Sequence, residues 1–319
     1  MELSVVVTIY NAEKSLPELT ERLVKVCSGL TETFEIIYVD DRSPDNSWMV
    51  LCYLSEQFST VKSIRFNRNF GQHTAISAGL HQACGQYVVM MDGDLQDEPE
   101  IIEKLYRKIK KENSQIIYVR RIDRKDDSSK KLSSLLYNYI FSKLSGIKSD
   151  PKIGTYRIMT KKVVDSFCQF PEVNKYIGGV FYWMNFTPSY LDAEHKERKY
   201  GKSNYTLRKM IKLATNGIVS YSNKPLTLSI YFGLICSILS FLMGLIFIFR
   251  KIVYDISITG YSSIIVSIYF LSGIVLMVLG VIGKYIAMIY EQSRSRPEYL
   301  IEETLNIKND EAGKTTHYR

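Results

Sequence analysis

Two long uncharged runs in the C-terminal third constrain the fold of this chain most strongly. Residues 226–249 and 262–283 form runs of 24 and 22 residues that contain no Asp, Glu, Lys or Arg. A helix needs about 20 apolar residues to cross a hydrocarbon core of about 30 Å. The runs therefore predict two transmembrane helices, at about 226–249 and 262–284, with both flanking parts of the chain on the same side.

Basic residues beside these runs predict the orientation. The loop between the runs carries Arg250 and Lys251, whereas seven basic residues flank the runs on the other side. These seven are Arg208, Lys209, Lys212, Lys224, Arg294, Arg296 and Lys308. Because cytoplasmic flanks are rich in Lys and Arg, we expect a multi-pass protein of the inner membrane with its N-terminal part in the cytoplasm. The five scattered cysteines, with no CxxC pair, are typical of reduced thiols and favour the same side.

The N-terminal part alternates short β-branched runs with helix-compatible stretches. The runs are Leu3–Ile9, Phe34–Val39, Val61–Phe66 and Tyr87–Met91. Runs that are apolar on both faces are typical of parallel strands buried between helices. The pattern predicts an α/β domain whose parallel sheet is covered by helices.

A polar cluster follows each of these four runs. The clusters are Tyr10-Asn11, Asp40-Asp41, Asn67-Arg68-Asn69 and Asp92-Gly93-Asp94. Ligands of open parallel sheets bind at the carboxyl ends of the strands. We therefore expect all four clusters to contribute to one site.

Asp92 and Asp94 flank a glycine, and two carboxylates at this spacing can hold a hard divalent cation. A cation beside a pyrophosphate offsets the charge that builds on a leaving nucleoside diphosphate. Alone the pattern is weak, because an acidic turn after a strand is common. The acidic stretch from Asp40 to Asp45 likewise fits a helix-capping turn as well as a binding loop.

The net charge of +8 points to an anionic partner. Nucleic acid, anionic lipid headgroups and phosphorylated substrates all satisfy it. The chain has no zinc-finger spacing, no RNA-binding signature and no single basic helix, so we expect no nucleic-acid partner.

Two further segments place apolar residues at helical spacing between lysines or arginines. Residues 130–146 favour a helix packed on the domain core slightly over a helix lying on the bilayer surface. Residues 205–219 lead directly into the first uncharged run, which favours the bilayer surface for them. The last 20 residues are polar without an apolar pattern, and we expect a mobile tail.

Four stretches of the chain resemble the successive motifs of family 2 inverting glycosyltransferases, and more narrowly the polyprenyl-phosphate subgroup. They read VVVTIYNAEKSL, VDDRSPDNS, NRNFGQHTAISAGLHQACGQYVVMMDGDLQDEPE and RKYGKSNYTLRKM. The resemblance runs from about residue 3 to 226. It implies a GT-A fold, a Rossmann-like and mostly parallel sheet with helices on both faces, followed by a two-helix transmembrane anchor. It also implies four segments: a catalytic domain over 1–200, an interfacial amphipathic segment over 201–225, the transmembrane helices within 226–290 and a polar cytoplasmic tail over 291–319.

The resemblance implies a role for each matching residue. The nucleotide would be bound by Thr8, Tyr10, Asn11, Asp40, Asp41, Arg68 and Asp92, with Asp41 holding the base. Mg²⁺ or Mn²⁺ would be held by Asp92, Asp94 and Gln96. Catalysis would involve Asp94, the paired arginines Arg121 and Arg124 near the acceptor phosphate, and Arg198. Arg157, Lys202, Ser203 and Tyr205 would contact the acceptor or close over it, although Arg157 equally fits a structural salt bridge.

One departure from the family pattern bears on the acceptor. Many members carry a carboxylate just before the aromatic residue of the segment PKIGTYRIM, where this chain has Thr155. Asp150 is the nearest alternative base. A phosphate monoester has its second pKa near about 6, so it is largely dianionic at neutral pH and needs no base. The departure therefore favours a phosphate over a hydroxyl as the acceptor.

The expected reaction moves a sugar from a nucleoside-diphosphate sugar to undecaprenyl phosphate, with inversion, for the synthesis or modification of cell-surface glycans. One rival is a family 2 transferase that acts on a hydroxyl of a lipid-linked glycan. A rival of another class is a non-catalytic scaffold or flippase component, although bunched carboxylates would serve no purpose there. The resemblance leaves a homo-oligomer and a flippase partner open, and it does not identify the sugar or the nucleotide.

Overall fold

The computed structural model describes residues 1–122, 141–147, 150, 152–172, 175–194, 215–254, 260–294 and 296–307. The chain divides into two compact units. Described residues of Met1–Asn138, Lys148–Thr206 and Ser295–Arg319 build the first unit, and those of Tyr139–Ile147 and Leu207–Arg294 build the second. The segments 130–146 and 205–219 lie largely outside the described residues.

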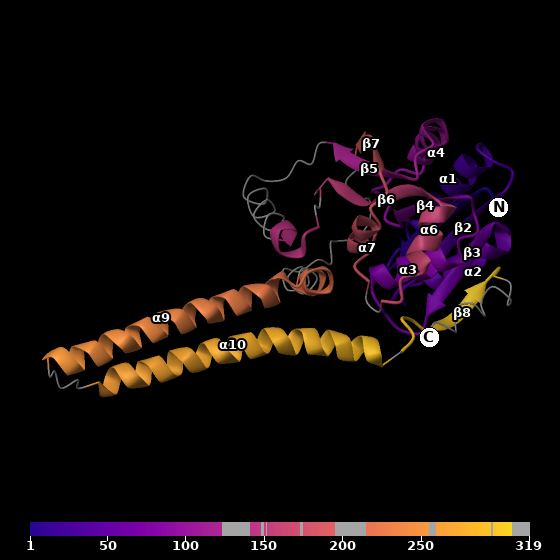
Figure 1. Ribbon diagram of the computed structural model, residues 1–319. Helices are drawn as coiled ribbons and strands as arrows, with labels where there is room; N and C mark the ends of the chain where they lie inside the picture. The colour runs from indigo at the N-terminus through magenta and orange to yellow at the C-terminus, as the bar shows by residue number, and fades with distance from the viewer. Residues whose placement is uncertain are drawn as a thin grey trace. The chain divides into compact units, whose positions relative to one another are not determined.

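The first unit contains an eight-stranded sheet in the order β7-β5-β6-β4-β1-β2-β3-β8 (Figure 1). The strands are β1 (Leu3–Ile9), β2 (Phe34–Asp40), β3 (Val61–Phe66), β4 (Tyr87–Asp92), β5 (Ile116–Ile122), β6 (Ile153–Thr160), β7 (Pro188–Glu194) and β8 (Ile301–Leu305). Strands β4, β1, β2 and β3 are parallel neighbours, as the four β-branched runs predicted. Both β2 and β4 extend one residue beyond the predicted runs, so Asp40 and Asp92 are the last residues of their strands.

Helices cover both faces of this sheet, which confirms the predicted α/β class. They are α1 (Leu16–Ser28), α2 (Ser47–Gln57), α3 (Gln72–Gln82), α4 (Ile101–Glu112), α6 (Lys161–Cys168) and α7 (Ile177–Met184). Buried residues of α1, α2 and α4 share one apolar core with alternate residues of β1, among them Val5 and Val7. Helix α3 packs on the opposite face, where Gly79 approaches Val6 and Val39 closely. The period-2 alternation of strand side chains explains why neighbouring β1 residues reach different layers.

The sheet becomes mixed beyond β4. Strand β6 pairs antiparallel with both β4 and β5, and β7 then pairs parallel with β5. Three antiparallel pairings therefore accompany four parallel ones, in agreement with a mostly parallel GT-A sheet.

The expectation of a mobile tail is wrong for part of the C-terminal segment. Residues Ile301–Leu305 form β8, which pairs antiparallel with β3 at the edge of the sheet. Asn306 then donates from Nδ2 to the carbonyl oxygens of Ser55 and Val61, at 2.7 and 2.8 Å. An edge strand can be polar because it is held by backbone hydrogen bonds and one of its sides meets solvent. Its sequence therefore lacks the apolar pattern by which the central strands were predicted.

The second unit carries two long apolar helices, α9 (Lys224–Tyr254) and α10 (Tyr261–Ser293). Within them, Lys224–Ile246 and Ile264–Ser293 have mean hydropathies of 2.1 and 2.6, and neither segment is buried within the protein. Most of their large apolar side chains are exposed, including Phe241, Val266 and Leu276. A helix of a soluble core would bury such side chains, so both helices are long and apolar enough to serve as membrane anchors.

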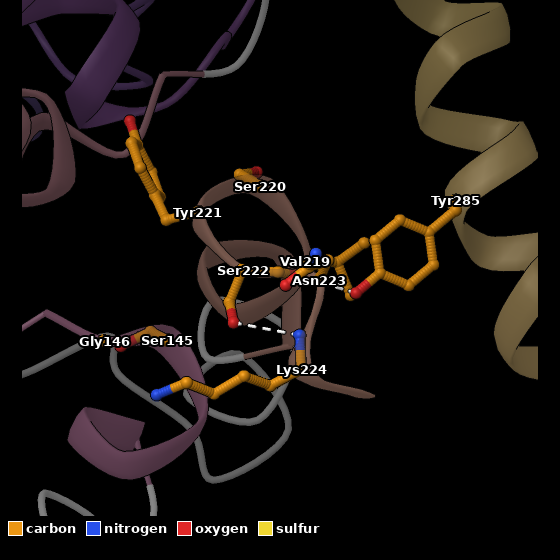
Figure 2. A pocket seen from close by; sticks show the side chains of 9 residues that line it. All are labelled: Ser145, Gly146, Val219, Ser220, Tyr221, Ser222, Asn223, Lys224 and Tyr285. Atoms are coloured by element: carbon orange, nitrogen blue, oxygen red, sulfur yellow. Dashed lines mark hydrogen bonds between the residues drawn. The ribbon is translucent and has the colours of Figure 1, made fainter. Parts of the chain in front are cut away.

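A polar pocket of about 570 Å³ lies in the second unit near the start of α9 (Figure 2). The Tyr285 hydroxyl donates to the carbonyl oxygen of Ser222 at 2.7 Å, and Lys224 Nζ donates to the carbonyl oxygen of Lys143 at 2.7 Å. None of the lining residues is acidic. The pocket therefore offers hydrogen-bond donors, but no carboxylate for a cation.

Candidate active site

The polar clusters after β1, β2 and β4 meet at one edge of the sheet. Ile9 pairs with Asp40, and Thr8 pairs with Asp92, so the ends of the three strands lie side by side. Because the three strands are parallel, the loops that follow them leave the sheet in the same direction. The predicted nucleotide-binding and metal-binding residues that end or follow these three strands are thus brought to one edge.

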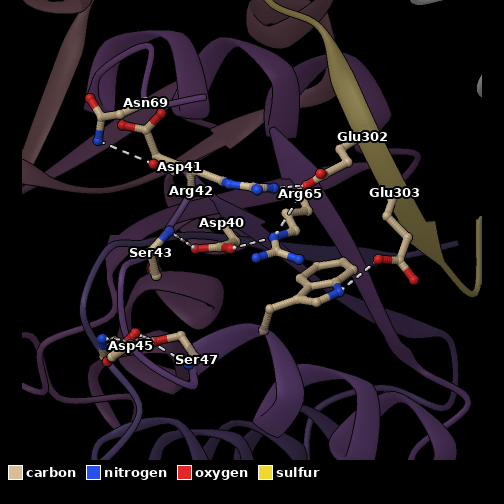
Figure 3. Close-up of polar contacts among 12 residues, drawn as sticks. Asp40, Asp41, Arg42, Ser43, Asp45, Ser47, Arg65, Asn69, Glu302 and Glu303 are labelled. Carbon is tan, nitrogen blue, oxygen red and sulfur yellow. Dashed lines mark hydrogen bonds and ion pairs between the residues drawn. The ribbon is translucent and has the colours of Figure 1, made fainter. Parts of the chain in front are cut away.

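Asp40 lies beneath this edge and is fully buried. Its Oδ1 accepts a hydrogen bond from the N–H of Ser43 at 2.9 Å, and its Oδ2 lies 3.7 Å from Arg65 Nε (Figure 3). Burial raises the pKa of Asp40, while the contacts with Ser43 and Arg65 lower it. Asp40 therefore shapes the loop that starts here, and a nucleotide would meet the next residue instead.

Asp41 joins this loop to the start of α3. Its Oδ1 accepts from the N–H of Phe70 at 2.6 Å, and its Oδ2 accepts from the N–H of Gly71 at 2.8 Å. Gly71 has a φ of 97°, a conformation that glycine adopts without a steric penalty. Burial raises the pKa of Asp41 to about 6, against the lowering effect of the two N–H groups. Each carboxylate oxygen has a further lone pair, so Asp41 can still accept a hydrogen bond from a ligand.

The loop after β1 is fastened to the loop after β2. The N–H of Asn11, a residue with a φ of 60°, donates to Ser43 Oγ at 3.0 Å. The N–H of Glu13 donates to Asp45 Oδ2 at 3.0 Å. Asp45 Oδ1 also accepts from the N–H of Ser47 at 3.2 Å, so this acid orders the turn that leads into α2, whose N-cap residue is Asn46. These contacts fix both loops around the place where Asp41 emerges.

Tyr10 and Arg68 stand at the solvent side of the same edge. Tyr10 is 47% exposed, and Arg68 is exposed with its guanidinium 4.5 Å from the centre of the Phe70 ring. Both side chains can therefore reach a planar or anionic ligand without displacing a packed neighbour.

The acidic loop after β4 is compact. Gln72 donates from Nε2 to Asp92 Oδ1 at 2.7 Å, and the N–H of Gln96 donates to Asp94 Oδ1 at 3.1 Å. A Cβ at Gly93 would lie 2.5 Å from Ile9 Cδ1 and 3.1 Å from the carbonyl oxygen of Thr8, which explains the glycine between the two acids. The loop therefore approaches β1 as closely as its backbone allows.

The donor set of this loop suits a divalent cation. Burial and the nearby carboxylates of Asp97 and Asp94 raise the pKa of Asp92 well above its ordinary value. A cation would relieve this repulsion and favour the charged form of the acid. Among the described residues, no group of three or more His, Cys, Asp and Glu side chains forms a complete metal cage. Mg²⁺ is typically bound by one or two carboxylates together with substrate phosphates and water, and two carboxylates with the Gln96 amide fit that mode.

Arg121 lies beside the acidic loop. Its Nη2 is 3.8 Å from Asp97 Oδ1, and its charge lowers the pKa of Asp92. A Cβ at Gly154 would lie 2.7 Å from the same Nη2, so the guanidinium rests against the backbone of β6. Arg121 thus places a positive charge next to the predicted metal ligands. Its predicted partner Arg124 lies outside the described residues, as do Arg198, Lys202, Ser203 and Tyr205.

The predicted alternative base, Asp150, has a structural contact. Its Oδ1 accepts a hydrogen bond from the N–H of Lys152 at 2.9 Å, in the turn that precedes β6. Thr155 lies on β6, which runs antiparallel beside β4 with Met90 opposite Arg157. Thr155 precedes that pair by two residues and Asp92 follows it by two, so the position of the family's carboxylate lies level with the acidic loop. The chain has a hydroxyl there.

Arg157 is buried on β6, with 6% of its surface exposed. Its guanidinium donates to the carbonyl oxygens of Thr155 at 3.0 Å and Gly154 at 2.9 Å. It also lies 4.8 Å from the ring centres of Tyr118 and Phe181. The structure gives no ion pair for Arg157 among the residues that it describes, so the salt-bridge alternative finds no support there.

Two residues of the site escaped the sequence analysis. Gln72, which contacts Asp92, and Asp97, which contacts Arg121, both lie inside the quoted motif stretch. The motif could have indicated them by position, but their contacts depend on how α3 and β5 meet the acidic loop.

Comparison with known proteins decides the family. The sequence profile described as Glycosyl transferase family 2 matches residues 4–167. The chain belongs to glycosyl transferase family 2. Within this family, it is 36% identical to the uncharacterized glycosyltransferase YkcC of Bacillus subtilis (strain 168), over 99% of this chain and 98% of the relative. It is 33% identical to the bactoprenol glucosyl transferase of Shigella phage SfX, over 95% of this chain and 99% of the relative.

A solved structure supports the fold of this family 2 member. Glucosyl-3-phosphoglycerate synthase from Mycobacterium tuberculosis, in complex with phosphoglyceric acid, superposes with a TM-score of 0.53 at 14% identity. The match covers 69% of this chain and 78% of that chain. The predicted GT-A fold and the predicted enzyme class, a glycosyltransferase, are both confirmed.

Proposed function

We propose that this enzyme transfers a sugar from a nucleoside-diphosphate sugar to a polyprenyl phosphate, as an inverting transferase of cell-envelope glycan metabolism. The observation that carries the proposal is that the match to a bactoprenol glucosyl transferase extends over nearly the whole of both chains. It therefore includes the region of α9 and α10 as well as the α/β domain. An acceptor that stays in the bilayer has to be met at its surface, which accounts for apolar helices on a nucleotide-sugar enzyme.

The donor would lie across the ends of β1, β2 and β4. Asp41, with Asp40 beneath it, would accept a hydrogen bond from the base, and Tyr10 and Asn11 would line the same pocket beside Thr8. Arg68 would contact the phosphates from the loop after β3. The support for this arrangement is the strand register that aligns Ile9 with Asp40 and the exposure of Tyr10 and Arg68.

Asp92, Asp94 and Gln96 would hold Mg²⁺ or Mn²⁺ beside the diphosphate. The cation would offset the charge that develops on the leaving nucleoside diphosphate. One solved relative in fold, glucosyl-3-phosphoglycerate synthase, was crystallised with Mn²⁺ and UDP. The raised pKa of Asp92 supports a cation at this place, since its cause is burial among like charges.

The acceptor phosphate would be placed by Arg121, together with Arg124, Arg198 and the loop residues Lys202, Ser203 and Tyr205. A phosphate oxygen attacks the anomeric carbon from the side opposite the diphosphate, and the bond to the diphosphate breaks, which inverts the configuration. The dianion needs no proton removed, so Thr155 in place of a carboxylate is compatible with this acceptor. Partial neutralisation by guanidinium groups and exact alignment are what the step requires.

The α/β domain would lie on the cytoplasmic side of the inner membrane, with α9 and α10 as its two spans. The excess of basic residues on the flanks supports this orientation. Cys84 is exposed in the first unit and offers a direct test. A membrane-impermeant maleimide should label Cys84 in inverted membrane vesicles and leave it unlabelled in intact cells. Labelling of Cys84 in intact cells would contradict the orientation.

The transfer itself is tested by following labelled glucose from UDP-glucose into organic-extractable lipid. Full-length protein in detergent with undecaprenyl phosphate and Mn²⁺ should give a labelled lipid, and the metal chelator EDTA should abolish it. Asp94→Asn should lower the rate by at least about 100-fold, whereas Asp165→Asn, the same change at an exposed position of α6, should not. A labelled lipid formed at the same rate by Asp94→Asn would contradict the role of the acidic loop. If UDP-glucose is inactive, GDP- and dTDP-linked sugars are tested in the same way.

A further inference from the structure

The chain returns to the first unit after α10 and closes the edge of the sheet next to the donor loops. Tyr299 is 8% exposed, and its ring stacks on that of Phe66 with centroids 5.1 Å apart. The N–H of Asn67 donates to the carbonyl oxygen of Leu300 at 3.1 Å. Strand β8 then pairs with β3. The segment from Tyr299 to Leu305 is therefore an ordered part of the α/β domain.

Glu302 of β8 reaches the loop that carries Asp41 (Figure 3). Its carboxylate forms an ion pair with Arg42, the residue directly after Asp41. The same carboxylate oxygen lies 3.5 Å from Arg65 Nε, which in turn lies 3.7 Å from Asp40 Oδ2. One side chain of β8 is thus linked through Arg65 to Asp40, and through Arg42 to the backbone that directly follows Asp41.

The backbone of Arg42 explains why such a link matters. Arg42 has a φ of 58°, in the left-handed region that non-glycine residues rarely adopt. A residue in this region persists only when its surroundings hold it there. The ion pair with Glu302 holds the Arg42 side chain, while Ser43 on the other side is held by Asp40 Oδ1. Together these contacts set the direction in which Asp41 leaves β2.

We propose that Glu302 is a positioning residue of the donor site, which acts through Arg42 and Arg65 to hold Asp41 for the nucleotide. The inference rests on the proposed function in one respect, the binding of a nucleotide by the Asp41 loop. Glu302 itself would touch neither substrate nor metal. The C-terminal segment that follows the membrane helices is then part of the donor site.

Glu303, the next residue of β8, provides a matched control. Its carboxylate accepts a hydrogen bond from Trp48 Nε1 at 2.9 Å, whereas the ion pairs of Arg42 and Arg65 on this strand are made with Glu302. Both glutamates are exposed residues of the same edge strand. Glu303→Gln therefore removes one charge from β8 and leaves the link to Arg42 in place.

The first experiment measures the order of the loop without any ligand. Hydrogen–deuterium exchange of full-length protein in detergent is followed in peptides that cover residues 40–46. In Glu302→Gln the amides of these peptides should exchange about threefold to fivefold faster, the factor expected for the loss of a partly exposed ion pair. In Glu303→Gln they should exchange as in the wild type. Equal exchange in the two variants would overturn the proposal.

The second experiment measures the effect on the donor. UDP affinity, with Mn²⁺ present, should fall about threefold to fivefold in Glu302→Gln, and the KM for the sugar nucleotide should rise by the same factor while kcat stays within about twofold. Arg42→Gln should change both quantities in the same direction, and the double variant should add little to Glu302→Gln, because both changes remove the ion pair between Arg42 and Glu302. A fall in kcat at unchanged KM, or fully additive effects, would overturn the proposal.

The outcomes separate this proposal from the proposed function. A wild-type protein that binds none of UDP, GDP and dTDP would contradict the donor assignment, and the exchange comparison would still decide whether Glu302 holds the loop. Melting temperatures of all variants are measured in parallel. If Glu302→Gln and Glu303→Gln have the same melting temperature, a loss of UDP affinity that occurs only in Glu302→Gln cannot come from general unfolding.

Discussion

Replacing Asp41 with asparagine should make the stability of the protein less dependent on pH while it weakens the donor site. The Asp41 carboxylate is 4% exposed, and burial raises its pKa from 3.8 to about 6. A carboxyl group whose pKa is higher in the folded than in the unfolded state adds fully to the folding stability at a pH below the unfolded pKa. This contribution is lost as the pH rises through the folded pKa. The wild type should therefore lose stability between about pH 4 and pH 6 because of Asp41.

The size of the effect follows from the shift. About two pKa units correspond to about 3 kcal/mol of unfolding free energy. Asparagine has no such pH dependence, but its amide group can accept from only one of the N–H groups of Phe70 and Gly71, which costs about 1–3 kcal/mol at every pH. The constant cost cancels when the same variant is compared at two pH values, so the pH-dependent part can be measured alone.

The assay is thermal unfolding of full-length protein in detergent, with Asp41→Asn and wild type compared at about pH 4.5 and about pH 7.5. Between these values the variant should gain about 2 kcal/mol relative to the wild type, or about 4–8 °C in melting temperature. Asp165→Asn serves as the control at an exposed position. If the melting temperatures of Asp41→Asn and the wild type differ by the same amount at both pH values, the conclusion that the buried charge of Asp41 destabilises the protein is refuted.

Three further predictions concern other parts of the site. Gly93→Ala should weaken Mn²⁺-dependent UDP binding, because its Cβ would lie 3.1 Å from the carbonyl oxygen of Thr8 and would force the end of the Ile9 side chain to move; wild-type affinity in calorimetry would contradict this. Tyr299→Ala removes a buried stacked ring and should lower the unfolding free energy by about 3 kcal/mol. A melting temperature within about 1 °C of the wild type would show that the C-terminal segment does not stabilise the sheet. Arg121→Ala should raise the KM for undecaprenyl phosphate by about tenfold. Arg120→Ala, which loses a surface ion pair, should leave this KM unchanged. Equal KM values in the two variants would contradict the assignment of Arg121 to the acceptor site.

Much of the fold was predictable because the central strands are short runs rich in apolar and β-branched residues. The runs Leu3–Ile9 and Val61–Phe66 coincide with β1 and β3 to the residue. Both strands begin and end with a buried apolar residue, which makes their limits visible in the sequence even though polar residues such as Lys62 and Arg65 lie between. The two uncharged runs likewise fall within α9 and α10, although both helices begin before the runs and end beyond them.

Strand β8 could not be predicted in this way. Its sequence, IEETL, contains two exposed glutamates, and what holds it is pairing with β3 and the ring of Tyr299 on Phe66. The ion pair of Glu302 with Arg42 joins residues 260 positions apart, and no local pattern carries such a contact. The positions of Asp41 and Asp92 could be predicted from the ends of the apolar runs that precede them, because the loops that follow parallel strands lie at the same edge of the sheet. Their pKa values are raised mainly by burial, which depends on how the surrounding elements pack and needed the structure.

The central claim, a phosphate acceptor, is tested most directly by comparing two lipids that differ only at the acceptor group. Release of nucleoside diphosphate by full-length protein in detergent is measured with the sugar nucleotide, Mn²⁺ and either undecaprenyl phosphate or undecaprenol. We expect release with undecaprenyl phosphate and none with undecaprenol. The reason is that this chain offers arginines for a dianion and has Thr155 where a base for a hydroxyl acceptor would stand. Equal release with undecaprenol, or release that needs neither lipid, would contradict the proposed acceptor.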